Sequence, residues 1–175
     1  LAPHLDRHAR GARGRVGVHV LGNGPHRRHR HARREDEPVA VGDAAAARRI
    51  SLALAPPAEP VWAKADEEGL RTILDNLVDN AIKYTPAGGR ITVRVRQQDG
   101  RAMLEVEDDG PGIPAEDREK IFERFYRMPG GAPEGCGLGL AIVREIAQGH
   151  QATVAVQSGT GGRGTRMTVT FPSSQ

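Results

Sequence analysis

Residues 66–86 of this 175-residue chain are D-E-E-G-L-R-T-I-L-D-N-L-V-D-N-A-I-K-Y-T-P, which predicts one long amphipathic helix. Asp66 is a suitable N-cap, and Glu67 and Glu68 follow in the first turn, where the helix dipole favours negative charge. Apolar residues then recur at alternating spacings of three and one, so they share one face. They are Leu70, Ile73, Leu74, Leu77, Val78, Ala81 and Ile82. Pro86 and the glycines at 88 and 89 end the helix.

The sequence on both sides of this helix predicts a mixed fold. Alternating apolar residues predict strands at 50–54, 61–62, 90–98, 101–107, 153–157 and 165–171. Asp99-Gly100 is a strong hairpin signal between two of these strands. A short helix is expected at 116–122 and a longer one at 138–148. No regular βαβ repeat is present, so we expect an α+β fold with a sheet layer and a helix layer.

Charge divides the chain in two. The whole sequence has 25 Lys+Arg and 22 Asp+Glu, a net charge of +3. Residues 1–49 carry +6 and hold six of the seven histidines, whereas residues 50–175 carry −3. The single cysteine, Cys136, excludes an intramolecular disulfide. We therefore expect a basic segment at 1–49, a folded domain at 50–172 and a tail at 173–175.

The basic segment lacks the composition of a folded domain. It has few large apolar residues, so we expect disorder before about residue 44 and helix only at 44–49. Its arginines raise the alternative of a nucleic-acid-binding module, but no aromatic residues accompany them to stack on bases. A metal site at His26, His29 and His31 lacks supporting acids or cysteines. The composition also resembles a GC-rich coding region translated in another frame.

Two groups of polar residues indicate binding chemistry. Asn76 and Asn80 are one helical turn apart, and Lys83 and Tyr84 follow one turn later. Amide oxygens are suitable ligands for Mg²⁺ and a lysine can bind phosphate, although solvent-exposed helix residues explain the same pattern. Asp108, followed by Gly110 and Gly112, ends a predicted strand. This carboxylate can accept a hydrogen bond from an exocyclic amine such as that of adenine, although an acidic turn is the simpler alternative.

A third motif, G-C-G-L-G-L at residues 135–140, begins a predicted helix after a Gly/Pro-rich loop. The free N–H groups at a helix start favour phosphate. The motif lacks G-K-[ST], so it is not a Walker phosphate loop.

Together these motifs resemble the ATP-binding catalytic domain of bacterial sensor histidine kinases. That superfamily includes type II topoisomerase, chaperone and mismatch-repair ATPases. Residues 76–86 resemble its N box, 108–114 its first glycine box, 121–127 its F box and 135–143 its second glycine box. The resemblance implies a Bergerat-type fold, with a mixed, mostly antiparallel sheet covered on one face by about three helices and a mobile ATP lid.

The resemblance also implies roles for individual residues. Asn76 and Asn80 would hold Mg²⁺ and the phosphates, with Lys83 and Tyr84 assisting, and Asp108 would bind the adenine amine, supported by Thr165. The remaining ATP-site residues implied are Gly110, Gly112, Ile113, Phe122, Arg127, Gly135, Gly137, Leu138, Gly139 and Leu140. Phe122, Phe125 and Arg127 would belong to the lid. Asn76 occupies the position where ATP-hydrolysing relatives have a glutamate, and an amide cannot act as a general base on water.

Three features depart from the family pattern. Cys136 replaces a serine or threonine, and residues 149–152 lack the usual His-Gly-Gly. No histidine in 1–49 has the sequence context of a phosphoacceptor, so we expect an incomplete histidine kinase that phosphorylates a helical hairpin supplied from elsewhere. Its other expected partners are ATP, Mg²⁺ and a response regulator, without nucleic acid or membrane contact, in the cytoplasmic portion of a sensor kinase. The alternatives are an ATP-hydrolysing or serine-directed relative and the basic nucleic-acid module.

Overall fold

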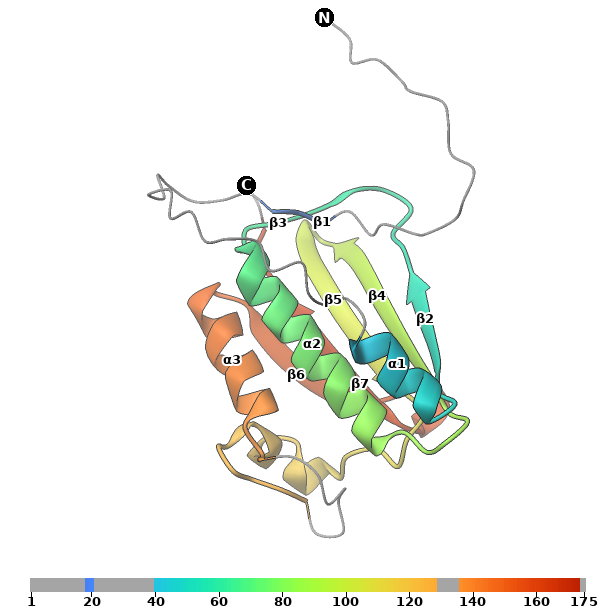
Figure 1. The fold of residues 1–175 in the computed structure, drawn as a ribbon. Helices are drawn as coiled ribbons and strands as arrows, with labels where there is room; N and C mark the ends of the chain where they lie inside the picture. The colour runs from blue at the N-terminus through green and yellow to red at the C-terminus, as the bar shows by residue number, and fades with distance from the viewer. Residues whose placement is uncertain (1–17, 21–39, 129–135, 174–175) are drawn as a thin grey trace, which may run out of the picture.

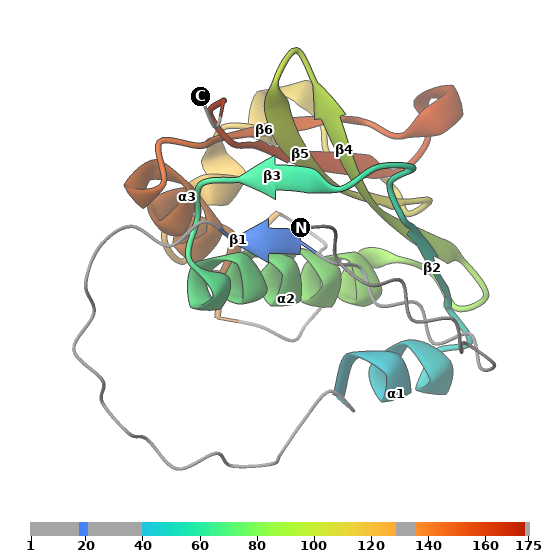
Figure 2. The same cartoon turned by 90° about the horizontal axis from the view of Figure 1, so that it is seen from above.

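The computed structural model describes residues 18–20, 40–128 and 136–173, which form a sheet layer and a helix layer (Figure 1). The main sheet has five strands in the order β2-β4-β5-β7-β6. Their bounds are β2 Ser51–Ala55, β4 Arg90–Gln98, β5 Arg101–Asp108, β6 Thr153–Ser158 and β7 Thr165–Thr170. β2 runs parallel to β4 and the other neighbours pair antiparallel. The helices α1 (Ala40–Ala47), α2 (Glu67–Tyr84) and α3 (Gly139–Gly149) cover one face, which confirms the expected fold class (Figure 2).

The central helix α2 forms as its sequence predicts. The Asp66 side chain accepts a hydrogen bond from the backbone N–H of Gly69 at 2.6 Å, which caps the first turn. The imidazole of His150, which caps the end of α3, lies 2.5 Å from the other Asp66 oxygen. The Gly69 N–H is the largest of the contacts that hold the pKa of Asp66 below its ordinary value. The start of α2 is therefore fastened to the end of α3.

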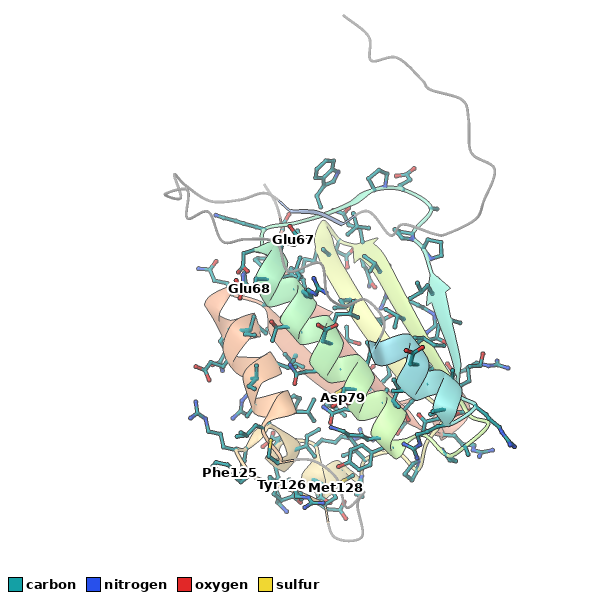
Figure 3. The ribbon with its side chains drawn as sticks, in the orientation of Figure 1. Glu67, Glu68, Asp79, Phe125, Tyr126 and Met128 are labelled. Carbon is teal, nitrogen blue, oxygen red and sulfur yellow. The ribbon has the colours of Figure 1, made fainter. Side chains whose placement is uncertain are left out.

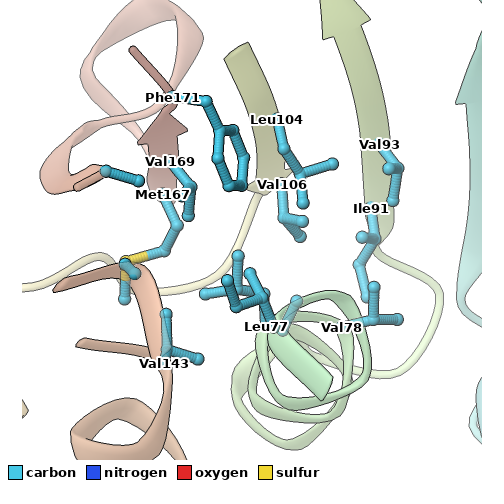
Figure 4. Packing of buried hydrophobic residues seen from close by; sticks show 14 of the residues in the cluster. Leu77, Val78, Ile91, Val93, Leu104, Val106, Val143, Met167, Val169 and Phe171 are labelled. Carbon is cyan, nitrogen blue, oxygen red and sulfur yellow. The ribbon is translucent and has the colours of Figure 1, made fainter. Parts of the chain in front are cut away.

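The core lies between the two layers (Figure 4). Leu77 and Val78 of α2 and Val143 of α3 are almost completely buried against the sheet. The facing sheet residues include Ile91, Val93, Leu104, Val106, Met167, Val169 and Phe171. The apolar stripe of α2 is therefore the helix side of one continuous core.

The β4–β5 hairpin turns at Asp99 and Gly100, both with positive φ (51° and 72°), as the Asp-Gly signal predicts. Its outer face carries ion pairs between the two strands. Arg94 binds Glu107 at 2.7 Å, and Arg96 binds Glu105 at 2.9 Å. Both carboxylates are buried beneath the guanidinium groups, so the polar face of the sheet is itself well packed.

Three segments differ from the expectations. The short helix expected at 116–122 is two 3-10 turns, Ala115–Asp117 and Lys120–Phe122. Short connecting segments of this kind commonly adopt 3-10 turns, and the second turn buries both Ile121 and Phe122. Val18–Val20, expected to be disordered, forms a strand, β1, parallel to β3 (Val61–Ala63), because its alternating β-branched residues suit an edge pairing.

The third difference is α1, which was expected only at 44–49. It begins at Ala40, and Ala45 is 3 % exposed within the core cluster. The packed unit therefore starts before residue 50, and residues 40–50, ahead of β2, belong to it. Residues 1–17 and 21–39 of the basic segment, with His26, His29 and His31, lie outside the described residues. Among the helices described, none has the length and apolar character to cross a bilayer.

Candidate functional site

A pocket of about 310 Å³ opens where the end of α2 meets the end of β5 and the start of β7. The segment that follows β5 and the start of α3 close its other sides. Thirteen of the sixteen residues predicted for the ATP site line it. They are Asn76, Asn80, Lys83, Tyr84, Asp108, Gly112, Ile113, Arg127, Gly137, Leu138, Gly139, Leu140 and Thr165. Four motifs that are distant in sequence thus meet at one cavity.

One end of the pocket, which we call the Asp108 end, is built mainly from backbone. Oδ1 of Asp108 accepts hydrogen bonds from the N–H groups of Gly110 at 2.9 Å and Thr165 at 3.3 Å. Burial raises the pKa of the Asp108 carboxyl above its ordinary value, and these two N–H donors oppose that shift. Within the described residues, hydrogen bonds to Asp108 reach only Oδ1, so Oδ2 is available to a ligand that donates hydrogen bonds.

The turn before Thr165 is pressed against the Asp108 backbone. Gly164 has a φ of +72°, and a Cβ added to it would lie 1.8 Å from the carbonyl oxygen of Asp108. Only glycine fits such an approach. The position of Gly164 and Thr165 therefore depends on this close backbone contact with Asp108.

Glu107 holds this turn from the opposite face of the sheet. Its carboxylate accepts a hydrogen bond from Thr160 N–H at 2.7 Å and pairs with Arg94 at 2.7 Å and Arg166 at 3.1 Å. Burial works to raise the pKa of Glu107, but the hydrogen bonds from Thr160, Arg94 and Arg166 outweigh it and lower the pKa to about 2. Glu107 thus supports the Asp108 end without lining the pocket.

The other end, which we call the Asn76 end, is built from side chains on α2 and from the start of α3. The Asn76 amide nitrogen donates to the Thr72 carbonyl at 2.8 Å, which orients its oxygen toward α3. A Cβ added to Gly139 would lie 2.8 Å from that oxygen and 3.4 Å from the Asn80 amide nitrogen. Lys83 forms an ion pair with Asp79 at 2.5 Å, one turn back on the same helix. Two amides and one ammonium therefore converge beside the N-terminus of α3.

The segment after β5 forms the outer wall of the pocket. Figure 3 places Phe125, Tyr126 and Met128 together at the end of the molecule opposite Glu67 and Glu68. Tyr126 donates from its hydroxyl to Asp117 at 2.8 Å, and its pKa is raised by this bond. The Phe125 N–H bonds the Gly137 carbonyl at 2.9 Å, and the Phe125 ring is 70 % exposed. This wall is thus tied to the start of α3 by backbone.

Three predicted residues do not line the pocket. Phe122 packs into the core at 7 % exposure, with the Arg144 guanidinium 5.7 Å from its ring centre, because the second 3-10 turn directs it inward. Gly110 instead supports Asp108, because its N–H donates a hydrogen bond to Asp108 Oδ1. Gly135 lies outside the described residues.

Several residues of the pocket were not predicted. Leu77 and Ala81 belong to the predicted apolar stripe of α2 and Val106 to a predicted strand, and all three also line the pocket. Ile142 lies within the 135–143 motif, whereas Met167, which arrives from β7, lies in no quoted motif. The others are Asp79, Pro111, Ile121, Tyr126, Met128 and Cys136, all within or beside the quoted motifs, where proximity to the motif was the available signal.

The amide oxygens at the Asn76 end can coordinate a hard cation only if other atoms, such as phosphate oxygens, complete its coordination. Within the described residues no group of three His, Cys, Asp or Glu side chains is placed to hold a metal. Amide oxygens are neutral donors, and Mg²⁺ in proteins commonly takes its remaining ligands from phosphates and water. The residues therefore fit Mg²⁺ carried by a phosphate group rather than a free-standing metal site.

A two-layer fold with an end pocket of this kind defines a nucleotide-binding class of domain, and comparison with known proteins agrees. Residues 65–175 match the family described as histidine kinase-, DNA gyrase B- and HSP90-like ATPase. The chain belongs to this family.

Several relatives within the family are sensor kinases. The chain is 40 % identical over 118 residues to sensor protein kinase PmrB of Pseudomonas aeruginosa, covering 67 % of this chain and 25 % of PmrB. The solved structure of the mycobacterial sensor histidine kinase MprB is 36 % identical, with a TM-score of 0.63, over 75 % of this chain and 89 % of that one. Full-length ShkA in complex with AMPPNP is 34 % identical, with a TM-score of 0.64, over 74 % of this chain and 27 % of ShkA. The chain thus spans about a quarter of the length of PmrB.

Proposed function

We propose that residues 50–172, together with α1, act as the catalytic domain of a sensor histidine kinase in a two-component system. The domain binds Mg-ATP and donates the γ-phosphate to a histidine of a phosphoacceptor helical hairpin, from which a response-regulator aspartate receives it. The observation that carries this proposal is the single pocket with a hydrogen-bond-accepting carboxylate at one end and two amides with a lysine at the other. The structure of the full-length ShkA relative contains AMPPNP, which supports a nucleotide as the ligand of this pocket.

Each end of the pocket has its own task. Asp108 Oδ2 accepts a hydrogen bond from the adenine amine, while Thr165 and Gly110 hold Oδ1. Asn76, Asn80 and Lys83 hold the phosphates and Mg²⁺ beside Gly139. Bound Mg²⁺ would neutralise phosphate charge during transfer.

The chemistry favoured is transfer rather than hydrolysis. An imidazole nitrogen of the acceptor attacks the γ-phosphorus, the N–P bond forms, and ADP leaves with the bridging oxygen. Asn76 cannot deprotonate water, and its amide nitrogen is already engaged by the Thr72 carbonyl. The domain therefore positions phosphates while the acceptor supplies the nucleophile.

Titration of the intact chain with Mg-AMPPNP tests the binding site. Asn80→Ala and Asp108→Ala should each weaken binding about tenfold or more, because each removes a hydrogen bond to a charged or buried group. Asp75→Ala is the matched control, since Asp75 is exposed on the same helix, where it pairs with Arg71 at 3.9 Å. Equal affinity in wild type and both site variants would contradict the assignment of Asn80 and Asp108 to the nucleotide site.

Radiolabelled ATP tests the reaction. Mixed with the phosphoacceptor hairpin of a related kinase, the chain should transfer label to an acid-labile phosphohistidine, and the isolated chain should release little inorganic phosphate. Steady phosphate release without transfer would instead assign the chain to the hydrolysing relatives. Acid-stable label would favour serine-directed transfer.

A further inference from the structure

Arg48, which follows α1, contacts the end of α2 from outside the pocket. Its Nη1 donates to the carbonyl of Ile82 and, at 2.9 Å, to the carbonyl of Lys83. The last carbonyls of a helix lack intrahelical partners and lie at the negative end of its dipole. A guanidinium group there both satisfies and stabilises them.

The turn held by Arg48 carries two pocket residues. Lys83 and Tyr84 line the pocket, whereas no residue of α1 or the connection to β2 does so. The backbone of Tyr84 is packed against Gly110, where an added Cβ would lie 2.9 Å from the Tyr84 carbonyl oxygen. Gly110 N–H in turn donates to Asp108 Oδ1. Direct contacts therefore lead from Arg48 to both ends of the pocket.

The backbone beside Arg48 holds the same region. The Arg48 carbonyl accepts a hydrogen bond from Gly88 N–H at 3.3 Å, and Ser51 N–H donates to the Gly89 carbonyl at 2.9 Å. Residues 85–89, which connect α2 to β4, are thus fastened to the end of α1 and the start of β2. Burial of Ala45 keeps α1 itself against the domain.

We propose that Arg48 is a positioning residue for the nucleotide site. Arg48 fixes the last turn of α2 so that Lys83, Tyr84 and the Gly110 backbone take the geometry that binds nucleotide. The segment ahead of residue 50 thereby acts on the site without touching the ligand. This inference rests on the proposed function, because its ligand is the nucleotide assigned there.

Mg-AMPPNP titration and thermal unfolding of four variants of the 175-residue chain test the proposal. Arg48→Ala should weaken binding about fivefold, consistent with the loss of one part-buried and one exposed charge-assisted hydrogen bond. Arg48→Lys should recover part of the affinity, because an ammonium can still donate to these carbonyls. Arg49→Ala is the matched control, since this exposed neighbour carries the same charge and should bind like wild type.

Ala45→Gly separates positioning from stability. It loosens the buried contact of α1 and lowers the melting temperature while leaving Arg48 in place, so the folded protein should bind nearly as tightly as wild type. The amide resonance of Gly110 should shift in Arg48→Ala and remain in place in Arg49→Ala.

The possible failures are distinct. A wild-type chain that does not bind Mg-AMPPNP would overturn the proposed function itself. A wild type that binds, with Arg48→Ala of equal affinity, would overturn only the role of Arg48. Ala45→Gly weakening binding as much as Arg48→Ala would reduce Arg48 to a structural contact.

Discussion

The two ends of the pocket are built by different means. At the Asp108 end, backbone atoms of the turn at 159–165 press against β5, and ion pairs on the far face of the sheet hold them. At the Asn76 end, side chains of α2 are oriented by contacts one turn away on their own helix, with Gly139 facing them. Changes at the Asp108 end should therefore damage fold and binding together, whereas changes at the Asn76 end should affect binding alone.

Gly164→Ala should give the largest effect. The added methyl group would lie 1.8 Å from the Asp108 carbonyl oxygen, so β5 and the turn would have to separate. We expect a loss of about 4 kcal/mol or more in the free energy of unfolding, with loss of Mg-AMPPNP binding. Urea unfolding followed by circular dichroism measures it.

Gly161→Ala is its control. Gly161 has the same φ of +72° in the same turn, but an added Cβ meets nothing within 4 Å. The control should cost only about 1 kcal/mol, from the left-handed backbone. Similar losses in the two variants would mean that backbone conformation, and not contact with Asp108, explains the glycine.

Glu107→Gln should have the next largest effect. The pKa of Glu107 lies at about 2 in the folded chain, below its ordinary value of 4.5. The stabilisation from its ion pairs is therefore complete above about pH 4.5 and is lost as the pH falls toward 2. The shift corresponds to about 3 kcal/mol at neutral pH, and Glu107→Gln should lose a large part of it. Urea unfolding between pH 7 and pH 3 measures this.

The pH dependence is the specific signature of Glu107. Glu105→Gln is the comparison, because Glu105 is equally buried but has one guanidinium partner, Arg96. It should retain the wild-type decrease in stability below pH 4.5. A Glu107→Gln variant with that same decrease would show that other carboxylates produce it.

Gly139→Ala tests the Asn76 end. Its methyl group would lie 2.8 Å from the Asn76 oxygen and displace that amide, so Mg-AMPPNP binding should weaken about tenfold. The melting temperature should stay equal or rise, because alanine favours helix. Gly149→Ala, at the other end of α3 with nothing within 4 Å, should leave affinity unchanged. If Gly139→Ala lowered both stability and affinity, it would contradict the expectation that changes at the Asn76 end affect binding alone.

Cys136→Ser should give the smallest effect. Cys136 is exposed at the pocket wall beside Gly137, and a hydroxyl is a better hydrogen-bond partner than a thiol. We expect Mg-AMPPNP affinity to rise about twofold, measured by the same titration. Cys136→Ala should bind like wild type, and equal affinity in all three chains would exclude contact between this position and the ligand.

The α2 helix and the hairpin were predictable because their signals are local. The apolar spacing of α2, the Asp66 cap and the Asp99-Gly100 turn need only neighbouring residues, and all three appear in the structure. The α1 helix was predicted only in part, because its reason is tertiary: Ala45 packs into the core and Arg48 reaches α2. An alanine-rich stretch with arginines carries no local sign of such contacts.

Pocket residues could be predicted from the sequence where they lie in a motif whose residues bind the same ligand. Asn76, Asn80 and Asp108 lie in such motifs and line the pocket. Phe122 does not line it, because its direction is set by the 3-10 turn that contains it. Glu107 was missed, since its partners Arg94, Thr160 and Arg166 come together only when β4, β5 and β7 pair.

The parallel pairing of β2 with β4 has a consequence for folding. The β4–β5 hairpin closes through a two-residue turn, whereas β2 can join only after the long α2 crossover has formed. We expect this edge to dock late and to open first in native-state hydrogen exchange, with amides of β2 less protected than those of β5. The part of the chain that carries Arg48 would then be the domain's least stable cooperative unit, and its opening would release the last turn of α2 long before the core unfolds.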